Sequence, residues 1–405
     1  MARLTAKPTF NSSYQITLTS HLTSFFKHPT VRATGVMFSF FGLMFGTWAA
    51  LIPFIKEKFA LDEAELGILL LCLPAGITVM NPFSVPILHK LGAVRSSLIA
   101  LPLAAAMFML PFAMPSVTFT GLSLFFAGTV FSMVNMSLNT CATQIEQRLD
   151  LRIMSTCHGL WSSGAMAGAA LASLAIGWGA TPVVYIGGVF LAEILVAFLS
   201  ARGLIGVPED HHASSGSDKK PSKFNLPSKA LWVLVGISLC TNITEGTMSD
   251  WSAVYLRDVV KAPGAMAGWG FSAYAFFMAG GRFLGDALIG QFGSRAMLRI
   301  GGLTAAAGLL LSVFCPYTAT SLVGFAMVGA GVALGAPILY AAAAKVPGMA
   351  KGAGLATMNT FAMIGFMGGP AVIGFVAKAF SLPVAFGMVA CFALFWAWRT
   401  GKMEG

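Results

Sequence analysis

The stretch EDHHASSGSDKKPSKFNLP, residues 209–227, indicates how the chain is divided, because it interrupts an otherwise apolar sequence near its middle. Its Ser, Lys, Asp and Pro residues bury little apolar surface, so the stretch predicts a flexible linker. On each side of it the chain holds six apolar windows, and a helix needs about 20 apolar residues to cross a bilayer core. We therefore expect an all-α membrane protein of twelve transmembrane helices in two six-helix bundles.

The composition supports a chain dissolved in lipid. It is 57% hydrophobic and only 10% charged, which leaves too little polar surface for a soluble exterior. The windows lack period-2 alternation, so helices are favoured over a β-barrel. The predicted spans are 32–54, 65–88, 95–115, 117–143, 154–177, 180–201, 229–255, 263–290, 296–315, 318–343, 352–375 and 379–398. They predict an N-terminal tail (1–30), an N-terminal bundle (31–201), a linker (202–228), a C-terminal bundle (229–398) and a C-terminal tail (399–405).

The positive charges predict the orientation. With the N-terminus inside, 19 of the 25 Lys and Arg fall in cytoplasmic segments and five fall outside, as expected for bacterial inner-membrane proteins. Twelve spans with both termini in the cytoplasm satisfy this rule. The basic residues lie at the ends of apolar segments and form no basic patch, so we expect no nucleic-acid partner. The first 30 residues contain no apolar core before a cleavage site, so we expect no signal peptide.

A weak internal repeat relates the two bundles. At an offset of 201 residues, four glycines fall on glycines in the corresponding predicted helices: Gly67, Gly92, Gly164 and Gly168 on Gly268, Gly293, Gly365 and Gly369. The first helices match at an offset of 203, which places Trp48 on Trp251. Two matching halves joined by a polar linker predict parallel, pseudo-symmetric repeats.

This arrangement resembles the major facilitator superfamily over nearly the whole chain outside the tail and linker. The general motif of that family is Gly-x-x-x-Asp-Arg-x-Gly-Arg, between helices 2 and 3 and again between helices 8 and 9. Here the first copy ends in HKLG (89–92), which includes Lys90 and has His where Asp is expected. The second keeps Gly281-Arg282-Phe283 but has Gly290-Gln291 where Asp-Arg would sit. We expect either that Asp286 substitutes in the cytoplasmic gate or that the gate uses other contacts.

More specific segments resemble one branch of that family. They are CHGLWSSGAMAGA (157–169), TEGTMSDW (244–251), GAGVALGAPI (329–338) and the turn at Gly368-Gly369-Pro370. With Asn139 and Glu146, they are similar to the branch containing the rhizopine-associated membrane protein MosC, and fucose-permease-type proteins are more distant. The resemblance implies a transporter of small molecules, sugar- or cyclitol-like, and a central cavity lined by helices 1, 4, 7 and 10.

The seventh predicted helix carries polar residues that are expensive in hydrocarbon. Asn242, Glu245 and Ser249 share one face, and Asp250 points elsewhere, nearer the outer surface. Glu245 is our main candidate for a proton-coupling carboxylate, because alternating wetting and burial would let it load and release a proton. It could instead bond a neighbouring helix or bind substrate. Asp250 is a second proton candidate, or it fixes the outer end of the helix.

The fourth helix places Asn135, Asn139 and Glu146 on one stripe. The two amides could hydrogen-bond a hydroxylated substrate or hold helices together, and Glu146 is a solvated or gating charge. His158, early in the fifth helix, suits a proton relay because imidazole titrates near neutral pH; a packing histidine is the alternative.

The repeat relates further polar and aromatic candidates. It pairs His158 with Asn359 and Asn139 with Tyr340, which favours a midplane site between the halves. Trp48, Tyr340 and Trp161 are expected cavity aromatics, although packing is the default role of each.

Arg282 lies within a predicted helix and pairs with Asn81 in the repeat. Its expected role is structural bracing, with Glu245, Asp286 or a substrate anion as the partner.

These residues predict a secondary active transporter that moves a small polar organic solute by alternating access, coupled to protons. The alternatives are a drug or metabolite efflux pump and a membrane-embedded sensor or scaffold. We expect no enzyme, because the chain lacks a Walker loop, HExxH and GxSxG. The six scattered cysteines form no CxxC pair, so we expect neither a metal nor a cofactor. The expected partners are the solute, protons and the lipid bilayer, and the expected state is a monomer.

Overall fold

The computed structural model describes residues 25, 27–151, 153–204, 229–346 and 353–401. Within them the chain is helical, and no strand occurs. The helices are α2 (Pro29–Lys58), α3 (Glu63–Leu91), α4 (Ala93–Ala113), α5 (Val117–Leu149), α6 (Met154–Gly177), α7 (Pro182–Leu204), α8 (Lys229–Asp258), α9 (Trp269–Phe292), α10 (Ser294–Phe314), α11 (Thr318–Val332), α12 (Gly335–Ala343), α13 (Ala353–Ala379) and α14 (Leu382–Gly401), with a 3-10 turn at Gly264–Met266. The predicted all-helical membrane fold is confirmed.

Two departures from the predicted spans have local causes. The tenth predicted span, 318–343, is divided into α11 and α12 at Ala333–Leu334. Pro337 has no N–H to donate to the carbonyl group of Ala333, which weakens the helix at this break. Among the described residues, eleven stretches are long and apolar enough to cross a membrane. One of them comprises α11 and α12 together, and α9 is the long helix that is not included. Arg282 and several glycines lower the hydropathy of α9.

The repeat is visible in the backbone. Gly92 ends α3 and precedes α4, and Gly293 lies in the same position between α9 and α10. Both have a φ of 80°, a conformation that glycine adopts without steric cost. The glycine pairing found in the sequence therefore reflects the same turn in both halves.

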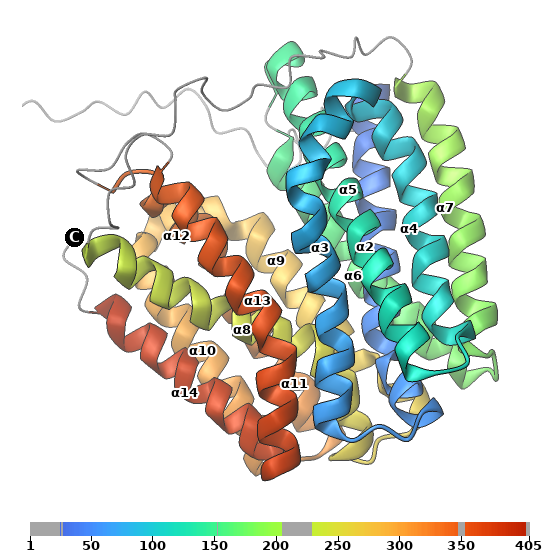
Figure 1. Cartoon of the computed structure of the whole chain (residues 1–405). Coiled ribbons are helices and arrows are strands. Elements are labelled where there is room, and N and C mark those ends of the chain that lie inside the picture. The colour runs from blue at the N-terminus through green and yellow to red at the C-terminus, as the bar shows by residue number, and fades with distance from the viewer. Residues whose placement is uncertain (1–24, 26, 152, 205–228, 347–352, 402–405) are drawn as a thin grey trace, which may run out of the picture.

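The helices form two groups, an N-terminal group of α2 to α7 and a C-terminal group of α8 to α14 (Figure 1). We call the end of the molecule where α7 stops and α8 starts the linker end, and the opposite end the far end. Figure 1 shows the groups approaching each other at the far end and diverging toward the linker end. The helices in contact across the groups are mainly α3 with α13, α6 with α9, and α2 with α8.

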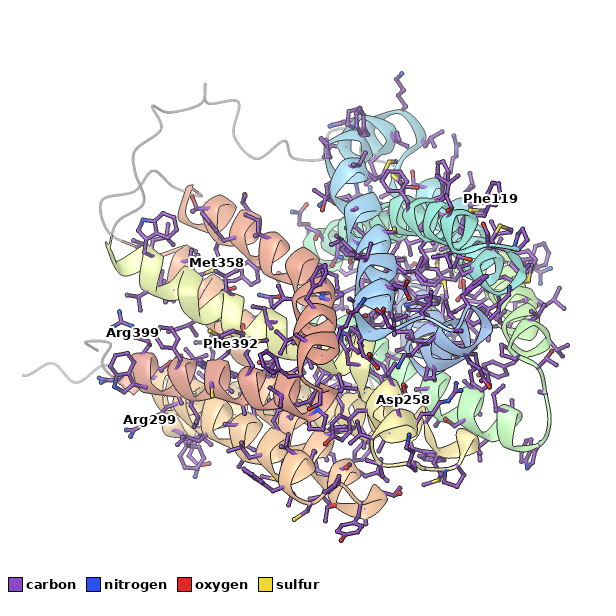
Figure 2. All side chains as sticks on the ribbon, turned by 60° about the horizontal axis from the view of Figure 1, so that its bottom comes forward. Phe119, Asp258, Arg299, Met358, Phe392 and Arg399 are labelled. Carbon is purple, nitrogen blue, oxygen red and sulfur yellow. The ribbon has the colours of Figure 1, made fainter. Side chains whose placement is uncertain are left out.

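The outer surface of both groups carries large apolar side chains. Phe83, Phe119 and Phe198 are each more than half exposed, and Figure 2 shows Phe119 at the periphery of the N-terminal group. Apolar surface of this extent is solvated by lipid rather than by water. The structure thus agrees with a multi-pass membrane protein.

Ion pairs join the two groups at the far end. Lys56, in the last turn of α2, contacts both Asp258 at the end of α8 and Glu63 at the start of α3, the latter at 2.9 Å. Arg257 contacts Glu57 at 2.7 Å. Figure 2, turned so that the far end comes forward, shows Asp258 where the groups meet. The far end of the molecule is closed by these contacts in this conformation.

A further pair at the far end involves the turn before α3. Lys378 lies 2.7 Å from the Asp62 carboxylate, and Asp62 also caps α3, because its Oδ1 accepts from the backbone N–H of Glu65 at 2.9 Å. The Lys378 ammonium and this backbone bond hold the pKa of Asp62 below its usual range.

Candidate functional site

A cavity of about 230 Å³ lies between the two groups of helices. Its walls come from α2, α3, α5 and α6 on one side and from α8, α9 and α13 on the other. The lining residues are Phe38, Phe41, Phe45, Leu73, Ile77, Phe131, Asn135, His158, Trp161, Ser162, Ala165, Glu245, Ser249, Phe271, Tyr274, Ala275, Met278, Arg282 and Phe366. Because both groups contribute, any rocking of one group against the other changes the shape of this cavity.

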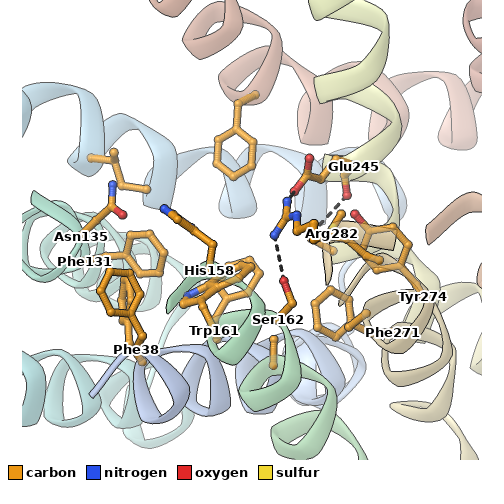
Figure 3. Close-up of a pocket in the computed structure, with 18 of the residues that line it drawn as sticks. Phe38, Phe131, Asn135, His158, Trp161, Ser162, Glu245, Phe271, Tyr274 and Arg282 are labelled. Carbon is orange, nitrogen blue, oxygen red and sulfur yellow. Dashed lines mark hydrogen bonds and ion pairs between the residues drawn. The ribbon is translucent and has the colours of Figure 1, made fainter. Parts of the chain in front are cut away.

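A chain of three polar side chains crosses the cavity. Arg282 of α9 donates from Nη1 to the Ser162 hydroxyl of α6 at 2.8 Å. Its Nη2 lies 3.7 Å from Oε1 of Glu245 in α8, which is a loose ion pair rather than a hydrogen bond. Figure 3 shows Arg282 between Ser162 and Glu245, with Tyr274 and Phe271 beside them. The Arg282 guanidinium therefore bridges the two groups of helices.

Glu245 points into the cavity because of its position on α8. Ser249, one turn further along, lines the same cavity, as the i, i+4 spacing requires. The Ser249 hydroxyl donates to the Glu245 carbonyl oxygen at 3.2 Å, so it binds its own helix. The Glu245 carboxylate accepts no hydrogen bond from any described residue, and the loose Arg282 contact is its ion pair.

On the opposite wall, His158 belongs to a cluster with two asparagines. Its Nε2 lies 3.2 Å from Oδ1 of Asn139, and its ring meets Phe38 edge-on. The Asn139 amide in turn donates to the backbone carbonyl and to Oδ1 of Asn135 at 2.7 and 3.0 Å. These polar groups of α5 and α6 are thus largely satisfied by one another.

Aromatic side chains form most of the remaining surface. Phe45 packs against Trp161, with ring centroids 5.6 Å apart, and against Phe131 and Phe271. Sequence reasoning missed the phenylalanines of this wall. A signal was present, because Phe38, Phe41 and Phe45 recur at intervals of three and four residues, which places them on one helix face.

The structure brings five of the predicted residues together at the cavity and places others elsewhere. Asn135, His158, Trp161, Glu245 and Arg282 all line it. Trp48, expected among the cavity aromatics, is 1% exposed and packs edge-on against Phe108 and Phe112 of α4. Its face of α2 is directed into the N-terminal group, and sequence position alone did not reveal that rotation.

Three other candidates for the cavity wall lie behind or beside it. Asn139 does not line the cavity but contacts His158, which does. Asn242 donates to the carbonyl and hydroxyl oxygens of Ser238 at 2.7 and 3.1 Å, within α8. Tyr340 of α12 is partly buried against the apolar core and is not among the lining residues.

The candidates for structural or gating roles are spread over the molecule. Glu146 accepts from the backbone N–H groups of Ile153 and Met154 at 2.6 and 2.8 Å, so it binds the start of α6. Asn81 accepts from the Ser132 hydroxyl at 2.7 Å, which joins α3 to α5.

Four candidates remain: the gating candidates Lys90 and Asp286, the proton-coupling candidate Asp250 and the cavity candidate Asn359. Lys90 is exposed in the last turn of α3, and Asp250 is partly buried in α8. The side chains of Asp286 and Asn359 lie outside the described part of the structure.

Comparisons with known proteins agree with this architecture. The profile of the family described as Major Facilitator Superfamily matches residues 32–262 and 237–401. An uncharacterized transporter of Sinorhizobium fredii is 30% identical over 366 residues, with 89% of this chain and 95% of that protein covered. Membrane protein MosC of Rhizobium meliloti is 30% identical over 390 residues, with 93% of each chain covered.

Two solved structures have a similar fold. The nucleoside transporter NupG superimposes with a TM-score of 0.70 at 12% identity, over 92% of this chain and 99% of that one. A bacterial homolog of the human lysosomal transporter Spinster, in an inward-facing and occupied conformation, gives 0.69 at 13% identity, over 93% and 96%. At these identities the likeness concerns the fold alone.

Proposed function

Because the chain belongs to the major facilitator superfamily and is a multi-pass membrane transporter, we propose that it moves a small organic solute by proton-coupled alternating access. We further propose that it works as a monomer in a bacterial inner membrane, with both termini in the cytoplasm, as its charge distribution favours. The domain division is proposed as before: tails 1–30 and 399–405, bundles 31–201 and 229–398, and linker 202–228.

One observation carries the coupling proposal. Glu245 is the acidic residue among those that line the cavity, and it faces the arginine that bridges to Ser162 of the other group. Protonation of Glu245 would remove its attraction for Arg282, and deprotonation would restore it. Glu245 and Arg282 both belong to the C-terminal group, so a proton on this carboxylate would act on the contact between the groups indirectly, by releasing the Arg282 guanidinium that donates to Ser162.

The far-end ion pairs support a cycle of alternating access. They join the groups at the end opposite the linker end, so the opening of that end requires their separation. The Arg282 bridge lies between the two ends and would serve as the point about which the groups rock.

Flux measurements in proteoliposomes test the proposal. Purified protein is given an imposed pH gradient, and solute accumulation is compared for the wild type and for Glu245→Gln. We expect the gradient to raise wild-type accumulation and to leave the Glu245→Gln protein without that increase, while solute exchange at equal pH continues. Equal wild-type uptake with and without the gradient would contradict proton coupling.

A second candidate function, export of amphipathic metabolites or drugs, is favoured by the aromatic wall of Phe45, Phe131, Trp161 and Phe271. Export would use the same cavity as uptake, but the net movement of the solute would have the opposite direction. Solute flux into inside-out vesicles is measured once with an outward-directed and once with an inward-directed proton gradient. The comparison distinguishes export from uptake.

A further inference from the structure

We infer that the solute is an organic anion with a flat apolar body, whose carboxylate binds Arg282 and the Tyr274 hydroxyl. This inference rests on the proposed transport function and names its substrate class. The polar groups of the cavity that have open hydrogen-bonding capacity gather around Arg282, and the rest of the wall is largely aromatic.

Several neutral polar groups of the wall are already engaged in part. His158 is bonded to Asn139, Asn135 accepts from Asn139, and Ser249 donates within α8. A sugar or cyclitol presents a hydroxyl group on nearly every carbon, and each group that is buried without a partner costs about 1–3 kcal/mol. The open groups at Glu245, Arg282 and Tyr274 lie together on one side of the cavity, and much of the remaining wall is aromatic, which suits a solute with one polar end better than a polyol.

The apolar surface of the cavity suits a flat ring. Phe41 and Phe131 pack with centroids 4.5 Å apart, and Trp161 and Phe271 both lie next to Phe45. Aromatic faces and edges at such spacings accept another ring in offset or edge-on geometry. The body of the solute is therefore expected to be aromatic or otherwise planar and apolar.

Arg282 has donor capacity left for an anion. Its Nη1 donates to the Ser162 hydroxyl. Its Nη2 lies 3.7 Å from Oε1 of Glu245, which is beyond hydrogen-bond distance. A planar guanidinium binds a carboxylate through parallel N–H groups, which a lysine could not reproduce. An anion entering the cavity would replace a loose pair by a close one.

Tyr274 supplies an independent observation at the same place. Its side chain is 2% exposed, and its hydroxyl has no hydrogen-bond partner among the described residues. Figure 3 shows Tyr274 beside Arg282 and Glu245. A buried hydroxyl without a partner is costly, and a carboxylate oxygen at Arg282 would accept from it.

The charge balance of the site favours an anion that travels with a proton. Among the described lining residues, Arg282 and Glu245 carry the formal charges, and His158 faces the cavity from α6 with its Nε2 bonded to Asn139, so the wall is neutral when this imidazole is uncharged. An anion with a proton on Glu245 keeps that balance, whereas a cationic solute would leave a net charge and lie close to Arg282. Net charge in a cavity of low dielectric is strongly unfavourable.

Binding measurements on the full purified chain test this inference. The probes are phenylacetate and indole-3-acetate, the isosteric amide phenylacetamide, the amine 2-phenylethylamine, and myo-inositol. Binding is followed by thermal shift and calorimetry, because a ligand stabilises the native state in proportion to occupancy. We expect at least one of the two carboxylates to bind, and phenylacetamide to bind at least about tenfold more weakly than phenylacetate.

Variants assign the carboxylate site. Arg282→Gln and Arg282→Lys are expected to weaken carboxylate binding by about tenfold or more, and Tyr274→Phe by about threefold to tenfold. Carboxylate binding to the wild type is expected to be accompanied by proton uptake, measured by calorimetry in buffers of different ionisation enthalpy. Glu245→Gln is expected to bind the same anion without that proton uptake. If the Arg282 variants do not fold, the Tyr274→Phe protein and the carboxylate–amide comparison on the wild type still decide the matter.

Failure of the inference and failure of the proposed function give different results. Tighter binding of the amide, the amine or inositol than of either carboxylate, or no carboxylate binding, overturns the anion assignment. If one of those other solutes is then driven by the pH gradient, the proposed function stands. If a carboxylate binds at Arg282 but no solute responds to the pH gradient, the anion site is supported and proton coupling is contradicted.

Discussion

The helix pair α2–α6 and its repeat-related pair α8–α13 have the same place in the two halves but differ in how closely their backbones pack. An added Cβ at Gly42 or Gly46 would overlap the carbonyl oxygen of Trp161 or Ala165. In the other half, an added Cβ at Gly369 would have nothing within 4 Å, whereas one at its repeat partner Gly168 would overlap the Leu43 carbonyl oxygen. The α2 and α6 backbones are in direct contact, whereas α8 and α13 pack through the Leu239 side chain at Gly365 and leave open space at Gly369.

The internal repeat relates this difference in helix packing to the cavity. At the offset of 203, Gly42 corresponds to Glu245 and Gly46 to Ser249. The face of α2 that packs against α6 therefore corresponds to the face of α8 that lines the cavity. The N-terminal half uses this face to build a rigid wall, and the C-terminal half uses it to present a carboxylate.

The largest expected effect comes from breaking the tight pair. Gly46→Ala places a methyl group on the Ala165 carbonyl oxygen, and we expect it to lower the free energy of unfolding by about 3 kcal/mol or more. Its repeat partner supplies the control, since Ser249→Ala removes only a bond within α8 and is expected to cost less than about 1 kcal/mol. Thermal unfolding in detergent measures both. Equal stability of the two variants would mean that the two faces pack alike.

A second prediction concerns a buried polar group of the rigid half. Glu193 of α7 is fully buried, and neither carboxyl oxygen has a hydrogen-bond partner among the described residues. Glu193→Met is expected to raise the stability by about 1–2 kcal/mol, because it removes an unsatisfied polar group. A loss of stability in the same unfolding assay would show that the carboxyl group has a partner in the membrane.

A third prediction concerns the link between the rigid wall and the cavity. Ser162→Ala removes the acceptor for Arg282, and we expect a loss of about 1.5 kcal/mol, the lower end for a hydrogen bond to a charged group. The neighbouring Ser163 donates to Gly159 within α6 at 2.9 Å, so Ser163→Ala is the matched control and is expected to have less effect. A larger loss from the control variant would argue against the bridge.

The smallest effect is expected at the far end. The pKa of Asp62 is lowered in the folded protein by Lys378, so the stability that this pair contributes is fully present above the usual aspartate pKa. It is lost as the pH falls through the lowered value. Asp62→Asn is expected to flatten the acid limb of the stability curve below about pH 4. Identical acid limbs for wild type and variant would exclude a contribution from this pair.

The candidate site could be predicted only in part from the sequence. Glu245, His158, Asn135, Trp161 and Arg282 were recognisable because ionisable, polar and amphipathic aromatic residues in apolar windows are unusual. The phenylalanines of the cavity wall were harder to recognise, since Phe in a membrane span has no cost, and the helical spacing of Phe38, Phe41 and Phe45 marks a face without showing what that face meets. Trp48 was misplaced for a related reason, because a tryptophan suits a packed core as well as a cavity.

What the sequence determined by itself about this protein is the part that depends on transfer into lipid. Hydropathy, the polar linker and the glycines that begin and end helices act locally, so the predicted spans, the two halves and the shared turn at Gly92 and Gly293 could be read from the chain. Only the tertiary structure decided which helix faces meet. Backbone contact at Gly42 and Gly46 fixes how α2 faces α6, and the packing of α8 beside α9 places Glu245 next to Arg282, because the rotation of each helix is set by its neighbours.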